Sequence, residues 1–265
     1  MKVIEKQFMH CDILDKVGYL VFNRPPLNLF NLAVFTEFSE MCDEIKELVN
    51  KDEVRVIVLS SAIKKAFSAG DDVKDGPKTS DEAVVQNDIA RSTMKKLTEL
   101  PIPMIGALNG YVMGGGAVLA LTCDYLIAAE NTTFAFSEID FGMFPNWGTT
   151  MVLGRRFSLP MVKKLLFTGE RFTPEFAKSI DMVQELVPAE DLNSKAMELA
   201  RTISVKAPIG VRCLKSLLNS SAGGITDEGH YHLETTYTRL TFDSEDTAEG
   251  VKAFAEKRKP VFANK

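Results

Sequence analysis

Residues 103–121 read PMIGALNGYVMGGGAVLAL, and this stretch decides the fold of the 265-residue chain. Pro103–Leu108 is a short apolar run of the kind that forms a buried strand. Asn109–Ala117 contains four glycines, and the apolar residues that continue through Leu121 predict that a helix begins within this segment. Because glycine leaves the backbone accessible and the first N–H groups of a helix lack internal partners, this turn predicts a receptor for an anion or oxyanion.

Two alternative roles for these glycines are open. A dinucleotide-binding loop needs G-x-G-x-x-G early in a βαβ unit and an acidic residue about 20 positions later. The glycines here are spaced G-x-x-x-G-G-G and lie in mid-chain, which disfavours that loop. The glycines could also serve only to let a helix pack closely against a sheet.

A second strand and loop repeat this arrangement upstream. Val54–Leu59 is a nearly continuous β-branched run, and the glycine-bearing segment Ala66–Val73 follows it. Ser80–Leu100, between the two strands, has a helical pattern, and this order predicts parallel βαβ units. Ligand sites gather beyond the carboxyl ends of parallel strands, so N–H donors from the two loops are expected to converge on one crevice.

The flanking segments complete the prediction of an α/β fold. Cys11–Leu14 and Val17–Phe22 predict a hairpin. Apolar residues at steps of three and four from Leu32 to Leu48 predict a helix of about 18 residues. The remaining predicted elements are short helices at Met161–Gly169, Thr173–Ile180, Asn193–Ser204 and Pro208–Asn219, with one extended segment at Val183–Val187.

Composition excludes several classes of protein. Hydrophobic residues make up 45% of the chain and charged residues 25%, as in an ordinary globular protein rather than a disordered or fibrous one. With a net charge of −5, neither nucleic acid nor a membrane surface is an expected partner. Charges at the N-terminus argue against an export signal, and Asp124 interrupts the apolar stretch Gly110–Ala129, so a cytoplasmic location is expected.

The cysteine and histidine residues do not predict a metal centre. The four cysteines have no CxxC pair, so they are predicted to fill the core rather than to form disulfides or a zinc site. His230 and His232 alternate in sequence without an evident third ligand, and no metal is expected. The cysteines are Cys11, Cys42, Cys123 and Cys213.

Several motifs, in their order along the chain, resemble the enoyl-CoA hydratase/isomerase (crotonase) superfamily. They are KAFSAGDD (65–72), NGYVMGGGA (109–117), CDYLIA (123–128), FSEI (136–139), FGMFP (141–145), LFTGE (166–170) and EGVKAFAEKRKP (249–260). The resemblance spans nearly the whole chain. It implies a crotonase-like spiral of ββα units over residues 1–200, and a helical region over 201–265 that mediates trimer contacts, usually within a hexamer.

The resemblance also implies a catalytic site. The backbone N–H groups of Asp71 and Gly115 would form an oxyanion hole around the carbonyl of an acyl-CoA thioester, and Glu138 would be the acid/base. Apolar neighbours of Glu138 are expected to raise its pKa, although a lone Glu is more often a surface residue. Family hydratases commonly use two carboxylates, and the first falls on Val118, which cannot transfer a proton.

A single carboxylate suits isomerisation of an enoyl chain and leaves hydration open, because one Glu can act as base and then as acid. Asp71 is unusual, since an anionic side chain beside a forming enolate would oppose it unless it is turned away or paired. Asn146 cannot act as nucleophile or base, as an Asp does there in some relatives, but it can donate a hydrogen bond.

The substrate contacts come from the same resemblance. Coenzyme A enters as part of the thioester substrate, so no separate cofactor is expected. For CoA, the implied contacts are the backbone of Ala66, Phe67, Ala69 and Gly70 and the segment after Arg24. For the acyl group they are Val118, Asn146 and Trp147, and for the nucleotide they are Phe254 and Lys257 of a neighbouring subunit. Trp147 could instead pack in the core, and Lys257 could instead belong to a solvated helix end.

Two further functions are open. The first is decarboxylation or C–C cleavage of a malonyl-type or cyclic β-keto acyl-CoA, because the tail from Phe242 to Pro260 is similar to that of bacterial methylmalonyl-CoA decarboxylase. This reaction needs the oxyanion hole but no obligatory base. The second is a non-catalytic acyl-CoA- or RNA-binding protein, against which the acidic balance and the intact Glu138 argue.

Overall fold

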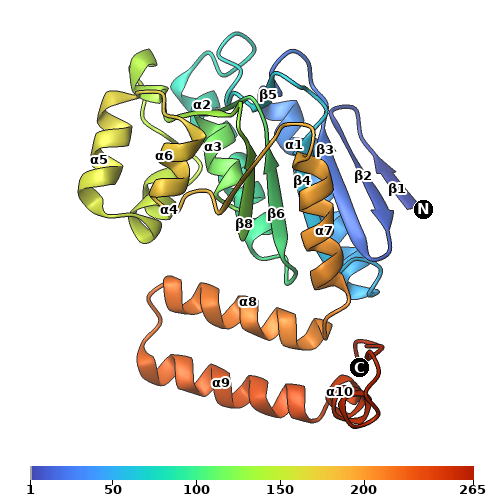
Figure 1. Cartoon of the computed structure of the whole chain (residues 1–265). Coiled ribbons are helices and arrows are strands. Elements are labelled where there is room, and N and C mark those ends of the chain that lie inside the picture. The colour runs from blue at the N-terminus through green and yellow to red at the C-terminus, as the bar shows by residue number, and fades with distance from the viewer. Residues whose placement is uncertain (1) are drawn as a thin grey trace.

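Two β-sheets form the core of the computed structural model, which describes residues 2–265 (Figure 1). Over those residues the larger sheet has the strand order β1-β2-β3-β4-β6-β8-β10, and the smaller sheet has the order β5-β7-β9. The strands are β1 (Lys2–Glu5), β2 (Met9–Leu14), β3 (Val17–Phe22), β4 (Val56–Ser61), β5 (Ala66–Ser68), β6 (Met104–Leu108), β7 (Tyr111–Met113), β8 (Tyr125–Ala129), β9 (Thr133–Ala135) and β10 (Glu185–Val187).

From β4 onward, successive strands alternate between the two sheets. Strands β4, β6 and β8 pair in parallel in the larger sheet, and β5, β7 and β9 pair in parallel in the smaller one. Helix α2 (Ser80–Thr98) follows β5, helix α3 (Gly115–Ala120) follows β7, and the 3-10 turn η1 (Glu138–Phe141) follows β9. The chain therefore winds as a spiral of ββα units, and the crotonase-like α/β fold predicted from the sequence is confirmed.

The central strands are buried on both faces, which explains their continuous apolar runs. On β4, Ile57 and Leu59 face the main core beneath α1 (Leu32–Asn50). Val56 and Val58 point the other way, into a second cluster covered by α7 (Leu192–Ser204). Each β-strand alternates its side chains, so one six-residue strand supplies apolar residues to two layers.

The longer predicted elements are confirmed, and the shortest ones differ from the predictions. Met9–Leu14 and Val17–Phe22 form the hairpin, and the helix that begins at Leu32 has 19 residues. The segment predicted as a loop from residue 66 begins with β5, and β7 lies between the Asn109 turn and α3. A three-residue strand is too short to show a period-2 pattern, so its pairing is set by the neighbouring turns of the spiral.

All four cysteines are buried and free, so the prediction that they fill the core is confirmed. Burial raises the pKa of the thiols of Cys11, Cys42 and Cys123 to about 12. These thiols are therefore protonated at neutral pH, and they are not nucleophiles.

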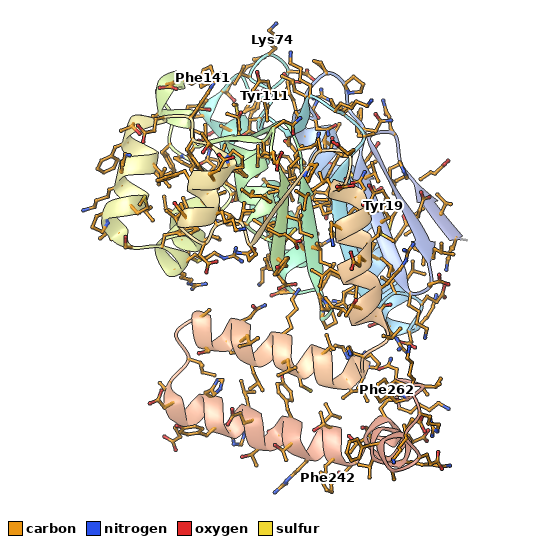
Figure 2. All side chains as sticks on the ribbon, viewed as in Figure 1. Tyr19, Lys74, Tyr111, Phe141, Phe242 and Phe262 are labelled. Carbon is orange, nitrogen blue, oxygen red and sulfur yellow. The ribbon has the colours of Figure 1, made fainter. Side chains whose placement is uncertain are left out.

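The last helices form a separate layer at one end of the core (Figure 1). Lys215 on α8 connects this layer to the core through Asp124 Oδ2 and the carbonyl oxygen of Ile102, each at 2.8 Å. Figure 2 places Phe242 at this end and Phe141 at the opposite end of the molecule. The remaining helices are α4 (Thr149–Arg156), α5 (Leu159–Thr168), α6 (Pro174–Ser179), α8 (Pro208–Ala222), α9 (Asp227–Phe242) and α10 (Glu245–Ala255).

Among residues 2–265, no helix has both the length and the apolar character that crossing a bilayer requires.

The contact between α3 and β5 is expected to depend on Gly116. A Cβ atom at Gly116 would lie 2.2 Å from the carbonyl oxygen of Ser68, whereas one at Gly154, on α4, would meet nothing within 4 Å. Gly116→Ala should therefore lower the free energy of unfolding by about 1 to 3 kcal/mol through overpacking. Gly154→Ala should raise it by up to about 1 kcal/mol through helix propensity. Urea denaturation measures both, and equal effects would contradict the close packing.

Candidate active site

The two glycine-bearing loops meet at their backbones. Gly70 has φ +85° and Gly114 has φ +52°, values that residues with a Cβ atom rarely adopt. A Cβ atom at Gly70 would lie 2.9 Å from the nitrogen of Gly115 and 3.0 Å from the carbonyl oxygen of Met113. The turn before Asp71 therefore lies directly against the N-terminus of α3, and the predicted convergence of the two loops is confirmed.

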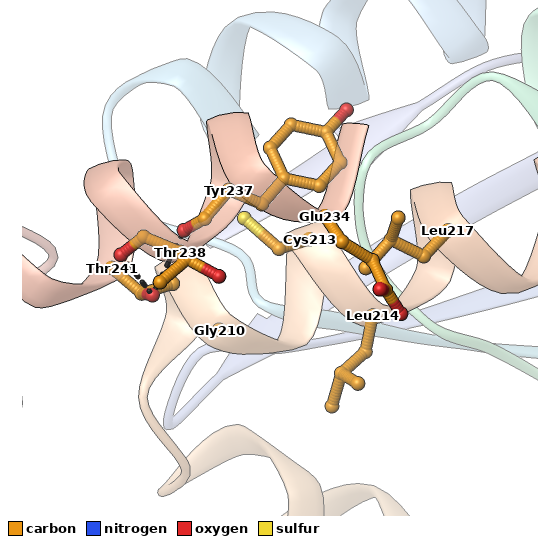
Figure 3. Close-up of a pocket in the computed structure, with 8 residues that line it drawn as sticks. All are labelled: Gly210, Cys213, Leu214, Leu217, Glu234, Tyr237, Thr238 and Thr241. Atoms are coloured by element: carbon orange, nitrogen blue, oxygen red, sulfur yellow. Dashed lines mark hydrogen bonds between the residues drawn. The ribbon is translucent and has the colours of Figure 1, made fainter. Parts of the chain in front are cut away.

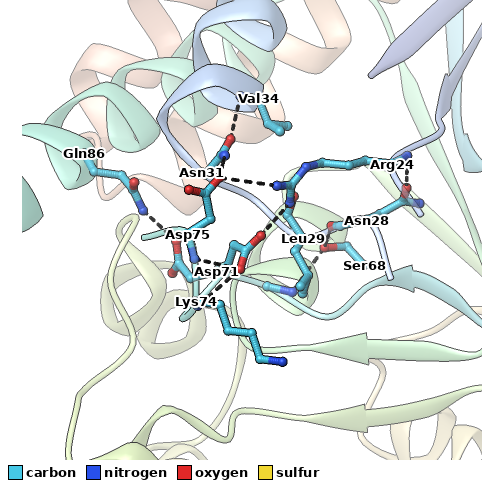
Figure 4. A network of polar contacts seen from close by, with 12 residues as sticks. Arg24, Asn28, Leu29, Asn31, Val34, Ser68, Asp71, Lys74, Asp75 and Gln86 are labelled. Atoms are coloured by element: carbon cyan, nitrogen blue, oxygen red, sulfur yellow. Dashed lines mark hydrogen bonds and ion pairs between the residues drawn. The ribbon is translucent and has the colours of Figure 1, made fainter. Parts of the chain in front are cut away.

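Buried polar groups hold the Gly70 turn in place (Figure 4). Asn28 donates to the carbonyl oxygen of Phe67 at 2.9 Å, and the hydroxyl of Ser68 donates to the carbonyl oxygen of Asn28 at 2.8 Å. Phe30 pairs with the chain on both sides of residue 71: its N–H donates to Gly70, and its carbonyl accepts from Asp72. This pairing leaves the N–H of residue 71 turned away from Phe30.

Arg24 and Asp72 hold the other side of the same turn. Arg24 donates to Asp72 Oδ2 at 2.9 Å and to the carbonyl oxygen of Leu29 at 2.8 Å. Burial opposes ionisation of Asp72, but the backbone N–H of Asp75 and the Arg24 guanidinium lower its pKa. The charge of Asp72 is thus neutralised within the loop.

Two backbone N–H groups at this junction have no internal partner. Within residues 2–265, neither the N–H of Asp71 nor that of Gly115 donates a backbone hydrogen bond among the turns, loops and helix caps. Gly115 is the first residue of α3, whose N–H groups carry the positive end of the helix dipole. Adjacent free donors of this kind suit an oxygen atom that becomes negatively charged.

Glu138 lies beside the same glycines. Its Oε1 is 3.3 Å from the position that a Cβ atom of Gly114 would occupy, and its Oε2 is buried without a hydrogen-bond partner. Burial raises the pKa of Glu138, as predicted. The reason differs in part, because its neighbours Ile139, Phe141 and Met143 are exposed.

A cavity of about 300 Å³ opens beside this junction. Of the residues expected there, Asp71, Asn146 and Trp147 line it, whereas Val118 is buried in the core and Glu138 is outside the lining. Trp147 lines the cavity and also packs in the core, since it is 4% exposed and meets Phe35 edge-on with ring centroids 4.8 Å apart; its contact with an acyl group stays a prediction.

Sequence reasoning missed two polar residues of this cavity, Gln86 and Asn87 on α2. Gln86 Nε2 donates to Asp71 Oδ1 at 3.1 Å, and Asn87 Oδ1 accepts from the backbone N–H of Trp147 at 3.2 Å. The available signal for Gln86 was that a polar residue occupies a core-facing position in the apolar pattern of α2. Hydrogen bonds between elements so far apart in sequence are invisible to that pattern.

The residues expected to contact coenzyme A lie in two places. Ala66 and Phe67 are fully buried in β5, and their backbone N–H groups donate to Ile63 and Asn109 within the protein. Ala69 and Gly70 belong to the junction, where the N–H of Ala69 donates to Leu27. Contact of these four residues with CoA stays a prediction.

Phe254 and Lys257 lie at and just beyond the end of α10, in the C-terminal layer. This layer is at the far end of the molecule from the loops of the site (Figure 1). Phe254 is 87% exposed. Within one chain the two residues are therefore not brought to the site, and a nucleotide contact requires a second subunit, as expected from the sequence.

No cluster of three or more His, Cys, Asp or Glu side chains placed to hold a metal ion occurs in the part of the chain that the structure describes. His230 forms a pair with Glu234 at 3.4 Å on one face of α9.

Comparisons with known proteins agree with this fold. The sequence profile described as enoyl-CoA hydratase/isomerase matches residues 12–265. A probable enoyl-CoA hydratase of Mycobacterium bovis is 34% identical over 95% of this chain and 96% of its own length. A probable mitochondrial enoyl-CoA hydratase of Dictyostelium discoideum is 33% identical over 94% and 88%. The crystal structure of an enoyl-CoA hydratase from Bacillus anthracis superposes with a TM-score of 0.92 at 31% identity, over 98% of this chain and all of that one. The chain belongs to the enoyl-CoA hydratase/isomerase family.

Proposed function

We propose that this protein binds an enoyl-CoA and moves a proton through Glu138 while two backbone N–H groups stabilise the thioester enolate. The observation that carries the proposal is the junction itself. The free N–H groups of Asp71 and Gly115 belong to loops in direct backbone contact, and the Glu138 carboxyl lies against the glycine between β7 and α3. The names of the relatives, enoyl-CoA hydratases, support a CoA thioester as substrate.

The chemistry follows from the acidity of the carbon next to a thioester. Removing a proton from that carbon places negative charge on the carbonyl oxygen, where fixed N–H donors are worth most. Losing one such donor typically raises the barrier by about 3 to 4 kcal/mol. Glu138, with its raised pKa, can take up this proton and return it to the same or another carbon, which gives double-bond migration or, with water, hydration.

Glu138→Gln is expected to lower kcat for double-bond migration or hydration at least about 100-fold, because the amide cannot exchange a proton. The measurement uses purified protein with a panel of Δ2- and Δ3-enoyl-CoAs and methylmalonyl-CoA. Asp140→Asn is the matched control, since it removes an exposed carboxylate of the same turn and should keep full activity. Full activity of the Glu138 variant, or release of CO₂ from methylmalonyl-CoA with no turnover of enoyl-CoA, would contradict the proposal.

We also propose that the C-terminal region, residues 201–265, joins copies of this chain into a homotrimer or homohexamer. Helices α8 and α9 enclose an open groove of about 330 Å³ between Cys213, Leu217 and Tyr237 (Figure 3). On α8, Leu214 and Leu218 are exposed, the latter by 67%. Exposed apolar side chains that lie close together on one helix indicate a surface that is covered in the assembly.

Light scattering coupled to size exclusion should give a mass three or six times that of one chain. Leu214→Glu combined with Leu218→Glu should shift the protein towards monomer, because charge on a buried interface is unfavourable. A matched control is Val84→Glu, which places the same charge on an exposed site of α2. A monomeric wild-type protein would refute the assembly.

A further inference from the structure

Asp71 has a side chain that the proposed function leaves without a role. Only its backbone N–H is needed to bind the thioester oxygen, yet its carboxyl group lines the cavity beside Asn146 and Trp147. Gln86 Nε2 donates to Oδ1, and over residues 2–265 the carboxyl has no other hydrogen-bond partner. One oxygen of Asp71 is therefore fixed by α2, and the other is available to a molecule in the cavity.

Covalent geometry places this carboxyl close to the reacting carbons. If the N–H of Asp71 binds the thioester oxygen, its own side chain is attached one atom further along the chain and opens on the same cavity. C2 and C3 of an enoyl group follow the carbonyl carbon directly. In that binding mode, a carboxyl group on the residue that binds the carbonyl oxygen can exchange a proton with the oxygen of a hydroxyl group or water at C3.

We propose that the Asp71 carboxyl is the second proton-transfer group of this site and enables hydration as well as isomerisation. The inference rests on the proposed function. In the dehydration direction, ionised Glu138 takes the proton from C2, and the electron pair moves into the enolate. The C3–O bond then breaks, the double bond forms between C2 and C3, and protonated Asp71 gives its proton to the departing hydroxyl, which leaves as water. Hydration is the same sequence reversed.

The surroundings of Asp71 raise the pKa of its carboxyl, so that a protonated form is populated near neutral pH. Burial raises its pKa to about 7, the hydrogen bond from Gln86 opposes this, and the charge of Glu138 adds to it. On the α2 side, the facing residues Gln86 and Asn87 do not titrate. In its own loop, Asp72 is paired with Arg24. Two neighbouring carboxyl groups that cannot both ionise readily share one proton, which is the state that the reaction needs.

A protonated Asp71 also removes the conflict raised by its residue type. An anion next to the oxyanion hole would oppose the enolate, whereas a neutral carboxyl does not. The pair formed by Asp71 and Glu138 thus replaces the two carboxylates of family hydratases, although the position expected for the first of them is occupied by Val118.

The test separates two reactions of one enzyme. Hydration of crotonyl-CoA, or of the enoyl-CoA from the panel that reacts fastest, requires both carboxyl groups. Exchange of the C2 hydrogen of butanoyl-CoA in D₂O, followed by mass spectrometry, requires Glu138 alone. Asp71→Asn and Asp71→Ala both keep the backbone N–H, so each should lose at least about 100-fold in hydration and keep exchange within about threefold. Glu138→Gln should lose both reactions.

Asp88→Asn is the matched control, because it removes an exposed carboxylate from the same helix as Gln86 and should change neither reaction. Hydration by both Asp71 variants within threefold of the wild type, or equal losses in hydration and exchange, would overturn the role of Asp71. A wild-type protein that neither hydrates nor isomerises any enoyl-CoA would instead overturn the proposed function, and the role of Asp71 with it.

The pH profile gives a readout that a structural role would not move. Because both directions need the Asp71–Glu138 pair with one shared proton, wild-type activity should fall as the pH rises through about 7, where the pair loses that proton. Gln86→Met removes the hydrogen bond that favours the ionised form, so this basic limb should move to higher pH. In Asp71→Asn the residual hydration should lack the limb, and a limb unchanged in both variants would overturn the assignment.

Discussion

The contact between the Gly70 turn and the N-terminus of α3 is the constraint on which the site depends. A single Cβ atom at Gly70 would clash with the backbone of Gly115, and one at Gly116 would clash with that of Ser68. The close approach is possible because both loops follow neighbouring strands of the small parallel sheet. It places two N–H groups from different units of the spiral next to each other, where no single loop could hold them.

The rest of the site is built around this contact. Asn28, Ser68 and Phe30 hold the Gly70 turn from the core side, and Arg24 neutralises Asp72. Glu138 lies beside Gly114, the residue that precedes α3, and burial raises the pKa of its carboxyl. The contact that brings the two loops together therefore also places the Glu138 carboxyl beside them.

Much of this arrangement could be predicted from the sequence. The stripe from Leu32 and the runs that became β4 and β6 predicted helix and strands, and the motifs around Gly70, Gly114 and Glu138 predicted the family and the convergence of the loops. The three-residue strands of the small sheet could not be read from periodicity, because only their partners define them. Helix α9 has no buried residue in one chain, so its pattern was weak.

Interactions between distant side chains were also out of reach. The burial of Glu138 was expected from its apolar neighbours in sequence, yet several of these are exposed, and its carboxyl lies beside Gly114 of another loop. From the sequence, an anionic Asp71 was expected to oppose the forming enolate, because nothing in the sequence indicates that Gln86 lies beside it. The raised pKa of its carboxyl is a consequence of three-dimensional burial, to which a second carboxyl group nearby adds.

A crystal structure with a non-reactive acyl-CoA thioester bound tests the central claim most directly. The account predicts the thioester oxygen at about 2.7 to 3.1 Å from the nitrogen atoms of both Asp71 and Gly115. The acyl carbons should then enter the cavity beside Trp147. A thioester oxygen bound to neither nitrogen, or to groups outside this junction, would contradict it.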